Sequence, residues 1–221
     1  MRRWWKSLDF YTSISEISDD RREQAEKVAS LIDLNTIDRI EVIETGASQN
    51  LGDGCFGLLF AHLANLDGGS FCSVDNDKEV CDSSIEIFNK FLPDLEYTAS
   101  TSDSIQFLEK YDGSPTIVHL DSWDLDIFDP EPAMLHGFLE FQAIESKMES
   151  GSYIVVDDNF MRGTFIFWDW NDGDTEQYEV RQEILGKGSM IYHYCKKPES
   201  PWELLGEYQL GPNQKLVLRK K

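Results

Sequence analysis

Acidic side chains follow four apolar segments of this sequence, each directly after the segment ends. Glu44 follows RIEVI, Asp75 follows SFCSV and Asp121 follows TIVHL. Asp157-Asp158-Asn159 follows YIVV in the same way. Such groups can accept hydrogen bonds from ribose hydroxyls, coordinate a hard divalent cation, or take a proton from a reacting group. Their recurrence predicts that one edge of a sheet carries the chemistry.

The turn after the first segment, Glu44 to Ser48 (ETGAS), lacks the features that bind phosphate. It has neither the G-x-G-x-x-G fingerprint of dinucleotide-binding proteins nor a Walker A lysine. An acidic residue beside the turn would also repel phosphate. We therefore expect a cationic or zwitterionic cofactor that has no phosphate. Its ribose hydroxyls would donate hydrogen bonds to the carboxylate of Asp75. S-adenosylmethionine meets these requirements, and the alternative for Asp75 is that it only caps the following helix.

Alternating strand and helix signals predict the scaffold that brings these ends together. Strands are expected at residues 39–43, 70–74, 95–98, 116–120 and 153–156, and helices at residues 19–32, 56–66, 80–91, 104–111 and 132–149. This rhythm predicts an α/β fold with a mostly parallel, Rossmann-like sheet flanked by helices. Ligands of such sheets bind beyond the carboxyl ends of the strands, where the strand order reverses.

The last quarter of the chain breaks this rhythm. Residues 160–195 have the pattern of aromatic-rich β structure with loops. Gly211-Pro212-Asn213 predicts the turn of a terminal antiparallel β-hairpin between residues 202–210 and 215–218. We expect a single domain over residues 1–221. Its parts are an N-terminal helical segment (1–37), a cofactor-binding core (38–159), an insertion (160–197) and the terminal hairpin (198–221).

The aromatic insertion is expected to cover the carboxyl ends of the strands as a substrate lid. The alternative is that its aromatic residues pack an edge strand or the interface of a homodimer. Those residues are Trp168, Trp170, Tyr178, Tyr192 and His193.

Composition excludes several kinds of partner. The chain has 20 Lys+Arg against 41 Asp+Glu and a net charge of −21, so we expect no nucleic-acid partner. No apolar run approaches the roughly 20 residues that span a bilayer, and MRRWWKSLDF lacks the apolar region of a secretory signal. Four cysteines without CxxC spacing indicate reduced thiols, which favours a cytoplasmic location without membrane contact.

These motifs resemble the class I S-adenosylmethionine-dependent methyltransferases, and within them the metal-dependent catechol O-methyltransferase type. The resemblance covers roughly residues 41–159 and the terminal hairpin. The most specific matches are Leu120-Asp121-Ser122-Trp123, where the family has L-D-H-W, and Asp157-Asp158-Asn159, where it has A-D-N. The cofactor-binding residues that it implies are Glu44, Gly46, Ser48, Asp75, Asn76, Ser102, Asp103 and Asp121.

The resemblance also implies a site for Mg²⁺ or another divalent cation, formed by Asp121, Asp158 and Asn159. The metal would bind the oxygens of a small hydroxylated acceptor and lower the pKa of the reacting hydroxyl. The family's general base is a lysine three residues after the aspartate, and this sequence has Asp124 there. The candidate catalytic residues are therefore Asp121, Asp124 and His119, although a histidine inside a strand is also a common core residue.

The sequence thus predicts an S-adenosylmethionine-dependent methyltransferase that methylates a hydroxyl group of a small molecule with the help of a divalent metal. One alternative is a member of the same fold that resembles sugar and antibiotic-pathway methyltransferases or cephalosporin-hydroxylase-like proteins. The other is a non-catalytic protein that binds S-adenosylmethionine or a partner. The strand-end acids can also be mere helix caps that repel one another.

Overall fold

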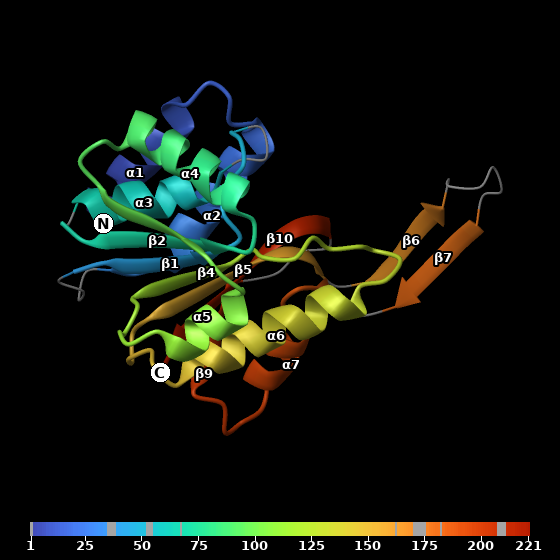
Figure 1. The fold of residues 1–221 in the computed structure, drawn as a ribbon. Coiled ribbons are helices and arrows are strands. Elements are labelled where there is room, and N and C mark those ends of the chain that lie inside the picture. The colour runs from blue at the N-terminus through green and yellow to red at the C-terminus, as the bar shows by residue number, and fades with distance from the viewer. Residues whose placement is uncertain are drawn as a thin grey trace.

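A mixed β-sheet forms the centre of the molecule (Figure 1). The computed structural model describes residues 2–34, 39–51, 55–66, 68–161, 163–169, 176–181, 183–206 and 211–221. The strand order is β3-β2-β1-β4-β5-β10-β9, and β8 also pairs with β5. The strands are β1 (Glu41–Thr45), β2 (Ser70–Asp75), β3 (Glu96–Thr101), β4 (Ile117–Leu120), β5 (Tyr153–Met161), β8 (Ile184–Gly186), β9 (Trp202–Leu205) and β10 (Gly211–Lys220).

Strands β1 to β5 pair in parallel, whereas β10 is antiparallel to both β5 and β9. The predicted Rossmann-like sheet with an antiparallel hairpin at its end is therefore confirmed. The predicted turn at Gly211-Pro212-Asn213 is wrong, because these residues lie within β10. The register between β10 and β5 shifts between Gly211 and Gln214, and proline is tolerated in a strand at such irregularities.

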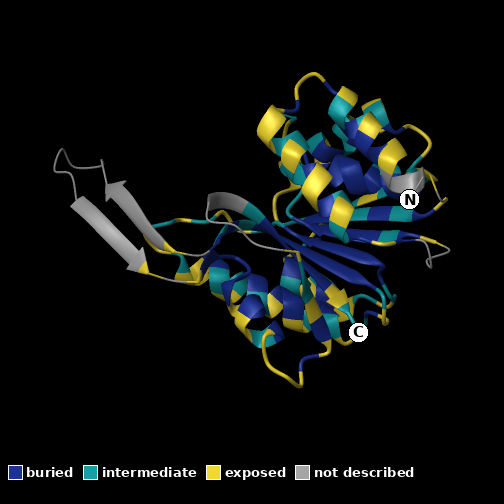
Figure 2. Ribbon diagram, turned by 180° about the vertical axis from the view of Figure 1, so that it is seen from behind, coloured by how far each residue is buried: buried dark blue, intermediate teal, exposed yellow. Residues whose placement is uncertain are grey.

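Helices cover both faces of the sheet because its strands are apolar on both sides. Helices α1 (Arg2–Ser13), α2 (Asp19–Leu31), α3 (Gly57–Leu66) and α4 (Lys78–Phe91) pack on one face; α5 (Ser104–Lys110), α6 (Glu131–Glu145) and α7 (Ser189–Cys195) pack on the other. Val42 and Val155 belong to the core under α1–α4, whereas their neighbours Ile43 and Ile154 belong to the core under α5–α7. Figure 2 shows the sheet buried between the two layers.

Strand β5 is longer than predicted, and this changes the setting of the acidic motif. The prediction ended the strand at Val156, but β5 continues to Met161. It continues because Asn159 pairs with Gln214 of β10 and with Gly186 of β8. Asp157-Asp158-Asn159 therefore lies within a strand, with Asp157 and Asn159 buried.

The insertion contains both β structure and a helix. Strands β6 (Thr164–Asp169) and β7 (Glu176–Arg181) form a separate two-stranded sheet that projects away from the main sheet in Figure 1. The role of the insertion as a substrate lid stays a prediction. Trp170 and the side chains of Trp168 and Tyr178 lie outside the described residues. The predicted β structure is wrong at α7, where Ile191 and Cys195 are buried four residues apart, as on one face of a helix.

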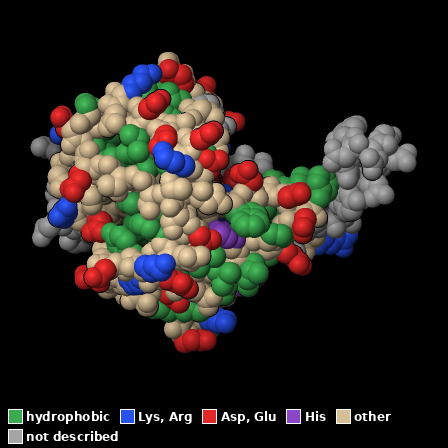
Figure 3. Space-filling view, viewed as in Figure 1, with side chains coloured by type: hydrophobic (Ala, Val, Ile, Leu, Met, Phe, Trp, Pro, Cys, Tyr) green, Lys and Arg blue, Asp and Glu red, His purple; other side chains and the backbone are tan. Residues whose placement is uncertain are grey.

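Acidic side chains are common on the surface, and Asp and Glu side chains are spread over the face seen in Figure 3. Among the residues that the structure describes, no helix has both the length and the apolar character needed to cross a membrane. The four cysteines are free thiols. Burial raises the pKa of Cys55 to about 12, so this thiol is protonated and unreactive at neutral pH.

Candidate functional site

A cavity of about 650 Å³ lies at the carboxyl ends of the parallel strands. It adjoins β1 and β4, which are neighbours in the sheet although β2 follows β1 in the sequence. This is the point where the strand order reverses, the usual ligand site of such sheets. The lining includes residues 46–50, Asp75, Asn76, Asp103, Ser104, residues 121–124, His136, Asp157 and Asp158. The volume falls in the range of small-molecule sites, which is roughly 300–1,000 Å³.

Gly46 fixes the path of the loop after β1. Its φ angle is +79°, and a Cβ atom added there would lie 2.5 Å from the carbonyl oxygen of Asp121. The Gly46 amide donates to the Val74 carbonyl at 2.8 Å. The next amide, of Ala47, donates to Asp75 Oδ2 at 3.0 Å. Only glycine fits this close approach, and the loop is thereby tied to the predicted ribose-binding carboxylate.

Asp75 faces the cavity and retains hydrogen-bonding capacity. Its two oxygens accept from the amides of Ala47 and Asp77, at 3.0 and 2.9 Å. Each carboxylate oxygen can accept a second bond. The cap of α4 is instead Asp77, whose side chain accepts from the Glu79 amide at 2.8 Å. The capping alternative for Asp75 therefore does not describe this helix.

Most of the predicted cofactor residues gather around the cavity. Gly46, Ser48, Asp75, Asn76, Asp103 and Asp121 line it. Ser102 and Glu44 are not part of the lining. Ser102 donates to its neighbour's carbonyl, and Glu44 is buried beneath the cavity. The lining residue Asp103 also caps α5 by accepting from the Gln106 amide at 2.9 Å.

Glu44 belongs to a buried polar row across three strands. Ser73, Glu44 and His119 are paired in register on β2, β1 and β4. Ser73 Oγ donates to Glu44 Oε2 at 3.0 Å, and His119 Nδ1 lies 3.0 Å from Glu44 Oε1. His119 is fully buried against Phe56 and Phe60. The predicted catalytic His119 therefore lies below the cavity and is not among its lining residues.

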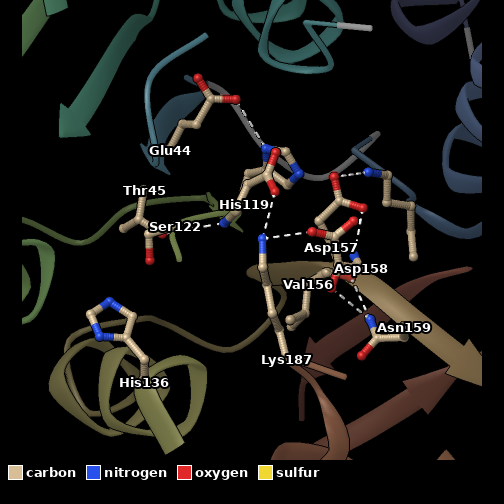
Figure 4. Close-up of polar contacts among 12 residues, drawn as sticks. Glu44, Thr45, His119, Ser122, His136, Val156, Asp157, Asp158, Asn159 and Lys187 are labelled. Atoms are coloured by element: carbon tan, nitrogen blue, oxygen red, sulfur yellow. Dashed lines mark hydrogen bonds and ion pairs between the residues drawn. The ribbon is translucent and has the colours of Figure 1, made fainter. Parts of the chain in front are cut away.

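Two lysines enter the acidic cluster from outside the predicted motifs. Lys187, which follows β8, lies 3.0 Å from Asp121 Oδ1 and 2.9 Å from Asp158 Oδ2 (Figure 4). Lys215 of β10 pairs with Asp157. Burial, together with Asp157, raises the pKa of Asp121 to about 6. Burial lowers the pKa of Lys187, but Asp121 and Asp158 more than compensate, so it lies above the usual lysine range.

The expected magnesium ligands do not fit a metal in this arrangement. Asn159 Oδ1 accepts from the Gly188 amide at 2.7 Å, and its amide nitrogen donates to the carbonyls of Val156 and Asp157. Asn159 is therefore a structural residue here, and its role as a metal ligand is not supported. Asp121 and Asp158 are both paired with Lys187. His119, Asp121 and Asp157 bring ligand atoms within 4.8 Å of one another, but lysines pair with both aspartates.

The opposite wall of the cavity comes from α6 and the loop after β4. Ser122 Oγ donates to Glu140 Oε1 at 2.6 Å. His136 Nε2 lies 3.1 Å from Ser104 Oγ, and the His136 ring is tilted by 35° against the Trp123 ring, with ring centroids 5.1 Å apart. Trp123 is 56% exposed and so offers an aromatic face to a ligand. The predicted base Asp124 also lines the cavity.

Sequence reasoning missed Lys187 and the pair of His136 and Glu140. The available signal for Lys187 was its position between two glycines, in Gly186-Lys187-Gly188. The available signal for His136 and Glu140 was their spacing of four residues within a predicted helix, which places both on one face.

The ion pair of Asp157 and Lys215 gives a testable prediction for stability. Both residues are buried, so Lys215→Met would leave an unpaired carboxylate and lower the free energy of unfolding by about 3 kcal/mol at neutral pH. Burial raises the pKa of Asp157, but Lys215 outweighs it and holds that pKa well below the ordinary value of 3.8. The pair's contribution is therefore present at neutral pH and declines as the pH falls below 3.8.

Urea unfolding at pH 7 and at pH 3 measures this effect. The difference between wild type and variant should be smaller at pH 3, and the double variant Lys215→Met, Asp157→Asn should recover most of the lost stability. A Lys215→Met protein as stable as wild type at pH 7 would contradict the pairing.

Comparison with solved structures shows which known proteins share the fold of this chain. No protein-family model matches this sequence, and no curated protein sequence matches it. TehB from Haemophilus influenzae aligns with a TM-score of 0.51 and 13% identity over 95% of this chain and 64% of TehB. A S-adenosylmethionine-dependent methyltransferase from Clostridium acetobutylicum ATCC 824 gives a TM-score of 0.50 and 11% identity, covering 99% of this chain and 91% of that protein.

A third structure was solved with cofactor. It is the magnesium protoporphyrin IX methyltransferase ChlM from Synechocystis PCC 6803 with bound S-adenosylmethionine, which aligns with a TM-score of 0.53. It is 11% identical over 91% of this chain and 80% of ChlM. Identities this low show the fold alone, and the structural neighbours are class I S-adenosylmethionine-dependent methyltransferases.

Proposed function

We propose that this protein, which has the fold of the class I S-adenosylmethionine-dependent methyltransferases, transfers the methyl group of that cofactor to a hydroxyl group of a small molecule. The observation that supports this most strongly is the position of Asp75. Its carboxylate faces a cavity of about 650 Å³ at the end of β2 and is tied to the Gly46 loop by the Ala47 amide. A ribose with two free hydroxyls matches that carboxylate.

The cofactor's other parts also have suitable neighbours around the cavity. Asp103, at the start of α5, would accept a hydrogen bond from the adenine amino group. The sulfonium would lie near Asp121 and Asp158, where negative charge favours a cation. The residues present thus fit S-adenosylmethionine, which supplies an activated methyl group when bound. By contrast they do not fit the divalent metal that the resemblance implied, and no step below involves a metal.

In the proposed reaction the acceptor oxygen approaches the methyl carbon in line with the carbon–sulfur bond. An oxygen–carbon bond would form while the sulfur–carbon bond breaks, and its electron pair would stay on sulfur, so that S-adenosylhomocysteine leaves. The hydroxyl proton would pass to a carboxylate of the cavity wall, and we assign this role to Asp121. Because its pKa is about 6, Asp121 is ionised at neutral pH and is a stronger base than an ordinary aspartate.

The composition of the cavity wall favours a particular kind of acceptor. Asp124, Asp157 and Asp158 would repel an anionic molecule. The exposed Trp123 ring adds an apolar surface to the same cavity. We therefore expect a neutral or cationic hydroxylated compound with an apolar or aromatic part.

A screen with S-adenosylmethionine labelled on the methyl group tests this proposal. The acceptors would be phenols, catechols, amino alcohols and sugars, with detection of labelled product and of S-adenosylhomocysteine. We expect an O-methylated product from at least one uncharged or cationic acceptor. Cofactor binding without transfer to any acceptor would instead support a non-catalytic binding protein, and preferred transfer to sugars would support the sugar-type branch of the fold.

A further inference from the structure

Lys187 lies where the resemblance places a divalent cation. Its ammonium nitrogen is 3.0 Å from Asp121 Oδ1 and 2.9 Å from Asp158 Oδ2. These are two of the three side chains expected to hold magnesium. We propose that Lys187 is the built-in counter-ion of this acidic site, so that the protein positions Asp121 for methyl transfer without a divalent metal. This inference rests on the proposed function only for its catalytic consequence.

The backbone around Lys187 is shaped to bring the lysine to this place. A Cβ atom added at Gly186 would lie 2.1 Å from the Asp158 carbonyl oxygen, and one added at Gly188 would lie 2.8 Å from Asn159 Oδ1. On the other side, a Cβ atom at Gly137 of α6 would lie 2.8 Å from the Lys187 carbonyl oxygen. Three glycines therefore admit the lysine backbone between β5 and α6. A surface lysine with an incidental ion pair would need no such fit.

Asn159 also holds the backbone next to Lys187 in place. Its side-chain oxygen accepts from the Gly188 amide at 2.7 Å, which holds the residue after Lys187 against β5. The side chain of Lys187 is 2% exposed, whereas those of Asp121 and Asp158 are 34% and 28% exposed. The ammonium group thus lies behind the two carboxylates, and the carboxylates face the cavity. Lys187 is accordingly a positioning residue, which acts on the acceptor through Asp121.

A lysine and a magnesium ion cannot share this position. The ammonium nitrogen already lies within hydrogen-bond distance of both carboxylates, whereas Mg²⁺ would need oxygens at about 2.0–2.1 Å in an octahedral arrangement. The three carboxylates of Asp121, Asp157 and Asp158 meet two ammonium groups, of Lys187 and Lys215. A dication would therefore have to displace Lys187 first. Removing the Lys187 charge should in turn create a site for a dication.

Manganese binding provides the test, with Mn²⁺ titrated into the protein and its free fraction read by electron paramagnetic resonance. We expect Lys187→Ala to bind one Mn²⁺ at least about tenfold more tightly than wild type, since two carboxylates then lack a counter-ion. Lys187→Arg keeps the positive charge and should bind no more Mn²⁺ than wild type. Lys196→Ala is the matched control, because it removes a 45% exposed lysine charge from the same segment and should change nothing.

Methyl transfer gives the second readout. We expect wild-type transfer to be unchanged by excess EDTA, and Lys187→Ala to lose about 100-fold in kcat without metal. Lys187→Arg should recover part of that loss, and Mg²⁺ should restore activity to Lys187→Ala but not raise that of wild type. Affinity for S-adenosylhomocysteine should stay unchanged, because Lys187 does not line the cavity.

Tight Mn²⁺ binding by wild type that Asp158→Asn abolishes would overturn this inference. This comparison of wild type with Asp158→Asn needs no lysine variant. It therefore tests the role of Lys187 even where Lys187→Ala does not fold. Tighter Mn²⁺ binding by Lys187→Ala than by wild type, in a protein that binds no S-adenosylhomocysteine, would support Lys187 as the counter-ion and refute the proposed function. Methyl transfer by the wild-type protein that depends on a bound metal would support the proposed function and refute Lys187 as the counter-ion.

Discussion

Replacing Asp75 with alanine is expected to raise the dissociation constant for S-adenosylhomocysteine by about 100-fold, because two hydrogen bonds from ribose hydroxyls to a carboxylate are lost. The Ala47 and Asp77 amides would also lose their acceptor, which loosens the Gly46 loop. Isothermal titration calorimetry with S-adenosylhomocysteine measures the effect without any need for the acceptor. An unaltered affinity would contradict the placement of the cofactor.

Asp77→Ala is the matched control for this variant. Asp77 lies two residues away and carries the same charge, but it caps α4 and is not among the cavity-lining residues. We expect a loss of about 1 kcal/mol in the free energy of unfolding from the missing cap. The affinity for S-adenosylhomocysteine should stay within about twofold of wild type, so the pair separates loss of cofactor contacts from general damage.

Replacing Asp121 with asparagine is expected to lower kcat for methyl transfer by about 100- to 10,000-fold, the usual range for loss of a general base. The asparagine oxygen can still accept from Lys187, so the geometry of the site is kept while the base is removed. Affinity for S-adenosylhomocysteine, which lacks the sulfonium charge, should change little. The measurement is single-turnover transfer to the best acceptor of the screen.

The dependence of kcat on pH gives an independent check on Asp121. Its pKa is raised to about 6, so the base is protonated and inactive below that pH. Wild-type kcat should therefore rise with pH and level off above about 6, and Asp121→Asn should lose this dependence. Asp129 is an exposed aspartate of the same loop. The variant Asp129→Asn, which removes the same charge, should leave kcat and its dependence on pH unchanged. If Asp124→Asn alone abolished transfer, Asp124 would be the base.

The sheet could be predicted because its signals are local. Short apolar runs such as residues 116–120, separated by helical patterns, determine strands and helices independently of one another. The ends of elements depend on tertiary pairing, which a single sequence does not contain. Strand β5 runs on to Met161 only because β8 and β10 lie on either side of it. Residues 189–195 form a helix within a segment whose aromatic composition favours β structure.

The proposed cofactor side of the site could be predicted for the same reason, since Gly46 directly follows β1 and Asp75 is the last residue of β2. The acceptor side was not. Lys187 reaches Asp121 from 66 residues away, and nothing in its neighbourhood except two glycines distinguishes it from a surface lysine. Asn159 matched a metal-binding motif by sequence, but its oxygen is used by the Gly188 amide. A motif specifies residue types, whereas the partners of each atom depend on elements distant in the chain.

A crystal structure of the protein with S-adenosylhomocysteine would show whether the cavity at the ends of the parallel strands binds the cofactor. We predict that the ligand lies in the cavity at the ends of β1, β2 and β4, with both ribose hydroxyls on Asp75, the adenine beside Asp103 and the sulfur facing Asp121. S-adenosylhomocysteine bound elsewhere, or no ligand in the cavity at millimolar concentration in solution and crystal, would contradict the assignment of this protein as an S-adenosylmethionine-dependent methyltransferase.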